Sequence, residues 1–382
     1  ATNALYRRKK KAWHVTSDVV EGDPDVMRGY LNRRMYEQSK KFDRRKDNAF
    51  FLPLTSTLLT KVVGLVYAEE PERTGIPQPM LDAAGPEGQS YQALMQDLAF
   101  NLLAYDYAGL VVSPQDSFAK IKVYQPQAIP RWNDAGLVTL THRAERAALN
   151  EVQETDQVWT VWMPDGWERY QQIENEMGEK EEVLVDSNEF GITFENERGT
   201  PEAPARMFQF VGSGQPALGI QLANAHLSIY RLRSSIDNAL QETVNSGLLQ
   251  VGAGSDKDFI KTLSDELKSD SPFVPYDKSY GEHKPLSLPT GPIEEARPHL
   301  KEKHKDLQKV VGIYAEEALQ SSATEAELSA RTGIFAIAQK LADRMQSIEN
   351  TVADIVAQSE ALPRDSVGVQ YPDINTPTQE QG

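Results

Sequence analysis

The chain has 382 residues, of which 40% are hydrophobic and 25% charged, and this globular composition leaves room for two or three domains at roughly 150 residues each. No cysteine occurs, so a disulfide framework, a thiolate metal site and a cysteine nucleophile are all excluded. The best apolar run, residues 62–68, is far shorter than the roughly 20 residues of a transmembrane helix, so we expect no membrane span.

The net charge of −16 is unevenly distributed along the chain. Residues 1–50 carry 13 Lys or Arg against 7 Asp or Glu, whereas residues 145–202 carry 4 Lys or Arg against 16 Asp or Glu. Attraction to phosphates needs clustered Lys and Arg, so a chain this acidic is a poor general nucleic-acid binder. An acidic wall would instead repel phosphates and let a duplex slide past it.

In chain order, residues 1–25 show no clear period and are predicted to be irregular. A helical pattern then covers residues 26–67, and Pro53 divides it into two helices because proline cannot continue a helix interior. Residues 71–88 form a connector rich in Pro and Gly, and residues 89–105 predict a further helix.

The first of these helices is rich in bases, and two roles are open for them. They would contact nucleic acid or a partner, or they would form a solvated helix face paired with Glu37, Asp43 and Asp47. The cluster consists of Arg33, Arg34, Lys40, Lys41, Arg44 and Arg45.

Seven runs rich in β-branched and aromatic residues follow, each bounded by turn signals. Two of them flank residues 164–166 (Pro-Asp-Gly) and predict a hairpin, which favours antiparallel sheet in an α+β domain. The predicted strands cover residues 108–112, 121–124, 137–142, 158–163, 168–173, 183–185 and 207–211.

The C-terminal half has the order helix, insert, helix, loop, helix. A helix over residues 216–246 has apolar residues three or four apart, and an insert of short strands and one helix covers residues 247–288. A second helix covers residues 289–314. A segment rich in Ser, Thr, Ala and Glu, residues 315–330, leads into a terminal helix over residues 331–362.

The terminal helix has the clearest pattern, because its apolar residues recur at alternating spacings of three and four and form one narrow seam. A capping-box pattern from Thr324 to Glu327 marks where it would begin. Residues 363–382 are polar, contain proline and predict an extended tail. The seam consists of Ile334, Ile337, Leu341, Met345, Ile348, Val352 and Ile355.

No motif for catalysis or cofactor binding stands out. Residues 212–219 contain three glycines, but their spacing fits neither a dinucleotide fingerprint nor a Walker A loop, so they predict a turn before a helix. The six histidines lack metal-ligand spacing and are expected at the surface. Among 56 acidic residues, no catalytic carboxylate pair can be nominated from spacing alone. We therefore expect no metal, no cofactor and no catalytic residues.

Three lysines, Lys301, Lys305 and Lys309, lie four residues apart on one face of the second C-terminal helix. Turned towards a channel, they would form stacked positive rings in an assembly. Turned outwards, they would form an ordinary salt-bridged surface with Glu302 and Asp306.

This order of elements resembles that of the portal, or head–tail connector, protein of tailed bacteriophages. Four stretches are similar in texture to that family: residues 30–34 (Tyr-Leu-Asn-Arg-Arg), 47–51 (Asp-Asn-Ala-Phe-Phe), 61–71 and 318–323 (Ala-Leu-Gln-Ser-Ser-Ala). The residues after Leu362 are too few and too polar to build the helical crown with which the family often ends.

The resemblance implies a portal-like α+β fold in which an α/β wing with antiparallel strands carries two stem helices and a small α/β clip. The wing would comprise residues 1–215 and the long helix 331–362, the stem helices 216–246 and 289–314, the clip 247–288, and the tunnel loop 315–330.

The resemblance also implies a function. Copies of the chain, typically twelve, would form a closed ring in the virion, at one vertex of the capsid, after synthesis in the host cytoplasm. Double-stranded DNA would pass through the ring without sequence specificity during packaging and ejection. The implied partners are the major capsid protein, the terminase large subunit, which would hold the ATPase motor, and a head–tail adaptor.

The resemblance assigns two groups of site residues. The tunnel loop would present Glu316, Glu317, Gln320, Ser321, Ser322 and Thr324 to the DNA. The clip would dock terminase and adaptor through Asp256, Lys257, Asp265, Lys268, Asp277 and Lys278.

Two other functions stay open. A different ring-forming virion component, such as an adaptor or a baseplate protein, would also be acidic and free of cysteine, but its elements would rarely have this order. A hydrolase with carboxylate catalysis would instead be a monomer or dimer with a deep pocket.

Overall fold

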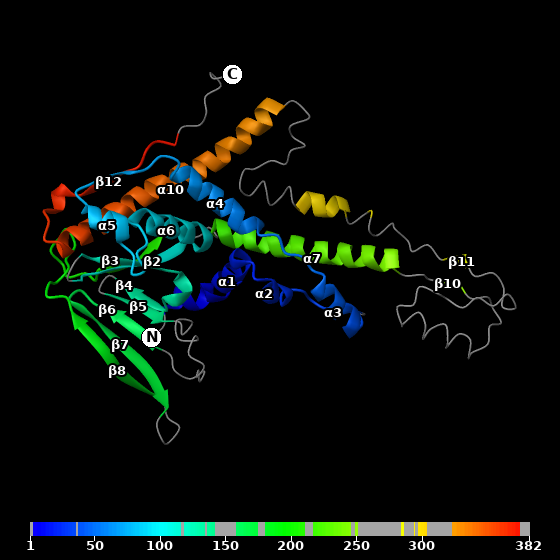
Figure 1. Cartoon of the computed structure of the whole chain (residues 1–382), viewed down its shortest axis with the longest axis horizontal. Coiled ribbons are helices and arrows are strands. Elements are labelled where there is room, and N and C mark those ends of the chain that lie inside the picture. Colours follow the sequence, from blue (N-terminus) through cyan, green and yellow to red (C-terminus); the bar gives the residue numbers. More distant parts are fainter. Residues whose placement is uncertain are drawn as a thin grey trace. The chain divides into compact units, whose positions relative to one another are not determined.

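The computed structural model is a mixed α+β structure with antiparallel sheets and long helices, as predicted (Figure 1). It has two compact units: unit 1 contains Ala1–Met27, Leu52–Leu227 and Lys305–Gly382, and unit 2 contains Arg28–Phe51 and Ser228–His304. The structure describes residues 3–35, 37–115, 118–133, 136–141, 158–174, 180–210, 217–245, 249–250, 284–285, 294, 297–303 and 323–374.

Helix α1 (Ala4–Glu21) opens unit 1 and corrects the prediction that residues 1–25 are irregular. The Asn3 side chain accepts a backbone hydrogen bond of the first turn at 2.8 Å, and Gly22 ends the helix in the left-handed conformation with φ of 66°. Trp13 is fully buried and donates to a backbone carbonyl 92 residues away at 3.0 Å. Capping and tertiary packing therefore form this helix, although the run of charges hides its period.

The helical pattern predicted over residues 26–67 is divided more finely than expected. The short helix α2 (Pro24–Arg28) comes first, followed by α3 (Ser39–Asp47) and then α4 (Leu54–Val66). Helix α4 begins directly after Pro53, which confirms the predicted boundary.

Two antiparallel sheets form most of the β structure described in unit 1 (Figure 1). One has three strands in the order β3-β2-β9, and the other is a five-stranded meander, β4-β5-β6-β7-β8, with β8 at its edge. The predicted hairpin at residues 164–166 joins β6 to β7. The bounds are β2 Tyr107–Ser113, β3 Lys120–Tyr124, β4 Arg131–Asn133, β5 Gly136–Thr141, β6 Val158–Trp162, β7 Gly166–Glu174, β8 Lys180–Glu189 and β9 Ala205–Gln209.

All seven predicted strands are present, because each satisfies a local pattern of β-branched and aromatic residues between turns. A buried apolar cluster shared by strands of both sheets joins the two sheets. It consists of Val111, Ile129, Leu137, Trp162, Ala203 and Ala205.

Helix α6 (Tyr91–Tyr105) forms the centre of the helical part of unit 1, and two-thirds of its residues are buried. The Ser90 side chain caps its first turn by accepting the amide of Ala93 at 3.2 Å, and Asp106 ends it with φ of 69°. The chain then enters β2, which is buried along almost its whole length. Among the described residues of unit 1, further helical elements are a short helix, α5 (Gln78–Ala83), and two 3-10 turns, η1 (Pro126–Ala128) and η5 (Arg364–Ser366).

Helix α7 (Leu218–Asn245) lies where the sequence predicts the first helix of the C-terminal half. Gly219 allows a close approach to α6, since a Cβ there would lie 2.4 Å from the backbone of Ala104. On the same helix His226 is buried, with its Nδ1 3.0 Å from the hydroxyl of Thr55. This burial corrects the expectation that all six histidines lie at the surface.

The terminal helix α10 (Ala323–Ser359) begins earlier than the predicted residue 331. Residues 323–330 have helical backbone, because their Ala and Glu content favours helix over the predicted polar loop. The apolar seam is confirmed along its second half, where it packs against α4 and α6. Its fully buried members are Leu341, Met345, Ile348, Val352 and Ile355.

After α10 the chain folds back onto unit 1. Strand β12 (Gly368–Gln370) pairs antiparallel with β1 (Glu72–Thr74), so this part of the predicted extended tail is a strand. Arg73 lies opposite Val369 in this pairing. The chain segments on both sides of the pair are thereby fixed against α10.

In unit 2, the predicted basic cluster divides into one buried and several exposed members. Arg45 is 3% exposed, and its guanidinium donates to both carboxylate oxygens of Glu37 at 2.8 Å and to the carbonyl of Asn32 at 2.8 Å. The hydrogen bond from Arg45 lowers the pKa of Glu37 to about 2. Arg45 is therefore paired with Glu37, as one of the two alternatives predicted, but it is buried rather than solvated. The exposed members are Arg33, Arg34, Lys40, Lys41 and Arg44.

Candidate functional site

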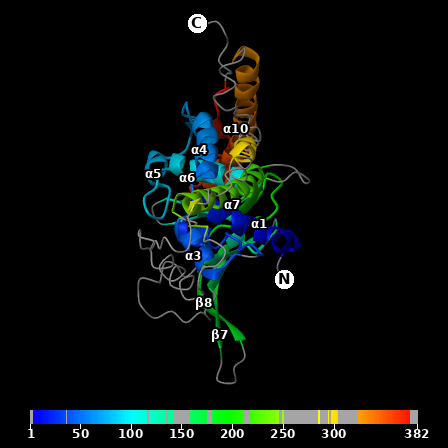
Figure 2. The same ribbon diagram turned by 90° about the vertical axis from the view of Figure 1, so that its right-hand side faces the viewer.

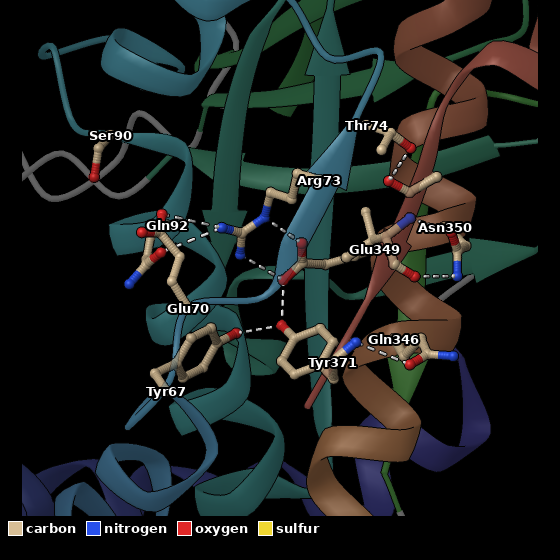
Figure 3. A network of polar contacts seen from close by, with 12 residues as sticks. Tyr67, Glu70, Arg73, Thr74, Ser90, Gln92, Gln346, Glu349, Asn350 and Tyr371 are labelled. Carbon is tan, nitrogen blue, oxygen red and sulfur yellow. Dashed lines mark hydrogen bonds and ion pairs between the residues drawn. The ribbon is translucent and has the colours of Figure 1, made fainter. Parts of the chain in front are cut away.

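A buried polar network joins three segments of unit 1 that are far apart in the sequence (Figure 3). Arg73 of β1 donates from Nε to one oxygen of Glu349 in α10 at 2.9 Å and from Nη2 to the other at 3.2 Å. Tyr371, just beyond β12, donates a short hydrogen bond to the same carboxylate. The hydroxyl of Tyr67 lies 2.8 Å from that of Tyr371. The Glu349 carboxylate thus accepts two hydrogen bonds from the Arg73 guanidinium and one from the Tyr371 hydroxyl.

Burial and charge fix the protonation of this network. Glu349 is fully buried. Burial opposes the charge of the Arg73 guanidinium, but its hydrogen bonds to Glu349 and the charge of that carboxylate together raise the pKa of Arg73 above its usual value. Burial, followed by the charge of Glu349, raises the pKa of Tyr67 and of Tyr371. The raised pKa values favour the protonated phenols, and the network forms a structural clamp that links β1, α10 and the residue after β12.

An open cavity of about 680 Å³ adjoins Arg73 on the surface of unit 1. Nη1 of Arg73 donates to Gln92 at 3.2 Å beside it, and the carboxylate of Glu70 lies 4.0 Å from the same nitrogen. Another residue that lines the cavity, Asp82, accepts a hydrogen bond from Gln78 at 2.9 Å. These charged lining groups already have partners within the chain, so the cavity contains no evident activated nucleophile among the described residues. Nor do the described residues bring three or more His, Asp or Glu together in a way that would hold a metal ion.

The predicted tunnel-loop and lysine positions are only partly described. Thr324 lies in the first turn of α10, on helical backbone rather than in a loop. Lys301 is exposed in a helical stretch, residues 297–303. Outside the described residues lie Glu316, Glu317, Gln320, Ser321, Ser322, Lys305 and Lys309.

The predicted clip residues also lie outside the described residues, but the two ends of the insert do not. Strand β10 (Leu249–Gln250) pairs antiparallel with β11 (Lys284–Pro285). The chain leaves along β10, shortly after α7 ends, and returns along β11 beside it. Residues 251–283 are therefore an excursion whose two ends are adjacent. The predicted clip residues, which all fall within it, are Asp256, Lys257, Asp265, Lys268, Asp277 and Lys278.

The sequence does not predict the ion pair between Arg73 and Glu349, although one signal for it is present. Glu349 lies on the face of the apolar seam, four residues after Met345 and three before Val352. A carboxylate on a buried face requires a cationic or hydrogen-bonding partner. That partner cannot be named from the sequence, because Arg73 is 276 residues away.

No protein-family model matches the chain, and no curated protein matches it. Solved structures that the comparison matches to this chain include the "Neck of empty GTA particle computed with C6 symmetry", at 10% identity and a TM-score of 0.46, covering 91% of this chain and 88% of that chain. They also include the "Neck of native GTA particle computed with C12 symmetry", at 11% identity and a TM-score of 0.45, with the same two coverages.

Across the described ranges, every helix is too short or too polar to cross a lipid bilayer.

Proposed function

We propose that this chain is a portal-type protein, copies of which form a ring through which double-stranded DNA enters and leaves a phage-like capsid. The observation that carries the proposal is the pairing of β10 with β11. This pairing supports an insert whose first and last residues lie side by side, between one helix and the next. A clip between two stem helices requires this arrangement. Helix α7 would be the first stem helix, and residues 289–314 the second.

The charge of the chain supports passage of DNA rather than tight binding. A net charge of −16 opposes strong phosphate attraction, so a channel lined by this chain would let the duplex move. We place Lys301, Lys305 and Lys309 towards the channel, where they would form positive rings. The tunnel loop would be the segment that precedes α10, and this segment would end at Ser322.

The partners follow from the same proposal. The insert would dock the terminase large subunit during packaging and a head–tail adaptor afterwards, while unit 1 would face the major capsid protein. The motor would belong to the terminase.

Mass photometry of the purified chain, followed by negative-stain imaging of the same sample, tests the proposal. We expect a ring of about a dozen copies with an open centre. A compact monomer or dimer would contradict the proposal and favour a hydrolase. A ring that binds a tail protein, but does not bind terminase in a pull-down, would identify an adaptor instead.

Replacing residues 251–283 by a short turn provides the matched control. The β10–β11 pair would be preserved, so we expect the ring to form and terminase binding to be lost.

A further inference from the structure

The exposed large apolar side chains of the described residues fall into two segments of the sequence. In the segment 26–50, Met35 is 87% exposed and Phe50 is 60% exposed, together with Val26. In the segment 173–192, Leu184 is 50% exposed and Val185 is 54% exposed, together with Ile173 and Ile192. Exposed apolar side chains that lie near one another in the sequence are candidate members of a contact surface.

The two segments carry opposite charges. Residues 26–50 contain 8 Lys or Arg against 3 Asp or Glu, whereas residues 173–192 contain 1 against 7. Each segment thus combines exposed apolar side chains with an excess of one charge, and the excesses are of similar size. Complementary charge of this kind selects and orients partners in an interface.

The acidic segment contains the edge strand of the five-stranded sheet. Figures 1 and 2 both show β7 and β8 extending away from the rest of unit 1. Nine of the ten residues of β8 are exposed. A register shift against β7 leaves Val185 as an extra residue beside Leu184, which places two apolar residues in succession at this edge. An edge strand of this length presents unpaired backbone groups to a partner.

An apolar strip leads across the sheet to this edge. Leu140 of β5 lies opposite Trp159 of β6, which lies opposite Tyr170 of β7, which lies opposite Leu184 of β8. Directly opposed residues share one face of a sheet, so the four side chains are neighbours. The rings of Trp159 and Tyr170 are stacked, with centroids 6.1 Å apart and planes at 16°. These four side chains form an apolar strip that ends at the β8 edge.

The basic segment is held in place in part by its buried arginine, Arg45. Arg45 is engaged with Glu37 inside unit 2, and this contact anchors α3. Lys40 and Arg44 are exposed and, four residues apart, share one face of that helix. Phe50, at the end of the segment, has the guanidinium of Arg233 5.8 Å from its ring and remains largely exposed.

We propose that the β8 edge of one copy docks on residues 26–50 of a second copy of this chain. The two surfaces differ, so the contact is head-to-tail, and it can repeat from copy to copy until a ring closes. Two β8 edges would not pair with one another, because both are acidic. This inference rests on the proposed function, for which it supplies the contact between neighbouring copies.

DNA is the competing occupant of the basic segment, because exposed Lys and Arg also attract phosphates. Phosphate contacts give no reason for Met35 and Phe50 to be exposed in the same segment. A partner surface that is both acidic and apolar would contact the exposed bases as well as Met35 and Phe50.

Cross-linking tests the contact directly, since the natural chain contains no cysteine. Copies carrying Leu184→Cys are mixed with copies carrying Phe50→Cys and treated with a short bismaleimide. We expect a cross-linked pair that contains both variants, and none from Leu184→Cys alone. As the matched control, Glu87→Cys, at an exposed turn outside both segments, should not link to Leu184→Cys.

Charge reversal supplies a second test without cross-linker. We expect Glu181→Lys with Glu182→Lys, or Lys40→Glu with Arg44→Glu, each to lower the assembled fraction about tenfold in mass photometry. The quadruple variant should recover assembly, because the attraction is restored with its sign exchanged.

The outcomes separate this inference from the proposed function. Rings that form without the mixed cross-link, and that tolerate both reversals, would overturn the contact and leave the portal proposal intact. A mixed cross-link without rings would support the contact and count against the portal proposal. Loss of DNA retention with unchanged assembly in the Lys40→Glu, Arg44→Glu variant would assign the basic segment to DNA and overturn the contact.

Discussion

Arg73 and Glu349 are 276 residues apart in the sequence and form a two-point ion pair in the interior of unit 1. Arg73 lies in a strand of only three residues, β1, which pairs with an equally short strand, β12. Two such strands contribute few backbone hydrogen bonds, so side-chain contacts fix them to α10: the ion pair at Arg73, and the Asn350 side chain, which bonds to both the amide and the carbonyl of Val369.

Replacing the carboxylate in Glu349→Gln is expected to destabilise the chain strongly. The variant leaves the buried Arg73 guanidinium without a counter-charge, which typically costs about 3–5 kcal/mol of the free energy of unfolding. Urea unfolding monitored by fluorescence measures the change. Glu70→Gln is the matched control: its carboxylate is near the same guanidinium but 76% exposed, and we expect a change below about 0.5 kcal/mol. Equal midpoints for both variants would contradict the clamp.

A pair of helical glycines tests the close packing of α7 on α6. Gly219→Ala would bring a Cβ within 2.4 Å of the Ala104 backbone, and we expect a loss of about 1–3 kcal/mol of unfolding free energy as the helices separate. Gly64→Ala, in α4, meets no atom within 4 Å and should instead stabilise by up to about 1 kcal/mol. Thermal unfolding of both variants should show shifts of opposite sign, and shifts of the same sign would refute the packing argument.

Lowering the pH should reduce the stability of unit 2, because the carboxylate of Glu37 becomes protonated. The folded-state pKa of Glu37 is about 2, below its ordinary 4.5, because Arg45 donates to it. Its contribution is therefore fully present above pH 4.5 and is lost as the pH falls towards 2. We expect this contribution to be at most about 2 kcal/mol, because the cost of removing both charged groups from water offsets part of the gain from the ion pair. The stability difference between wild type and Glu37→Gln, measured by urea unfolding from pH 7 to pH 3, should shrink as the pH falls; a constant difference would argue against the pair.

Deleting Gln320–Ser322 tests the proposed tunnel loop without shortening α10, which begins at Ala323. In particles assembled with this variant we expect normal heads that retain less packaged DNA. A replacement of the same three residues by Gly-Ser-Gly should retain DNA, because the proposed contact is polar and has no sequence preference. Normal packaging and retention by the deletion variant would remove the loop from the channel.

Local patterns predict much of this fold. Seven strands, β2, β3 and β5 to β9, and the seam of α10 each depend on a local pattern of residues, and the structure contains them, whereas β4 is not predicted. Helix α1 escapes prediction because five consecutive bases, residues 7–11, obscure its apolar face, whose burial depends on distant partners of Trp13.

The candidate sites are harder to predict, for two different reasons. The Arg73–Glu349 pair is non-local, so no window of sequence contains both of its members. The exposure of a side chain is also not predictable from local sequence. The exposure of Leu184 depends on the sheet order, which places β8 at an edge. The opposite charges of the two proposed docking segments are visible in the sequence, but which apolar residues accompany them at the surface is not.

The pairing of β10 with β11 has an evolutionary consequence. Because Gln250 and Lys284 already lie opposite one another, the chain between them can be lengthened, shortened or exchanged without moving the segments that enter and leave it. A single recombination event could therefore supply a new recognition surface while the rest of the chain is inherited unchanged. We expect related chains to diverge fastest between residues 251 and 283, with change elsewhere limited by buried contacts such as the one between Arg73 and Glu349.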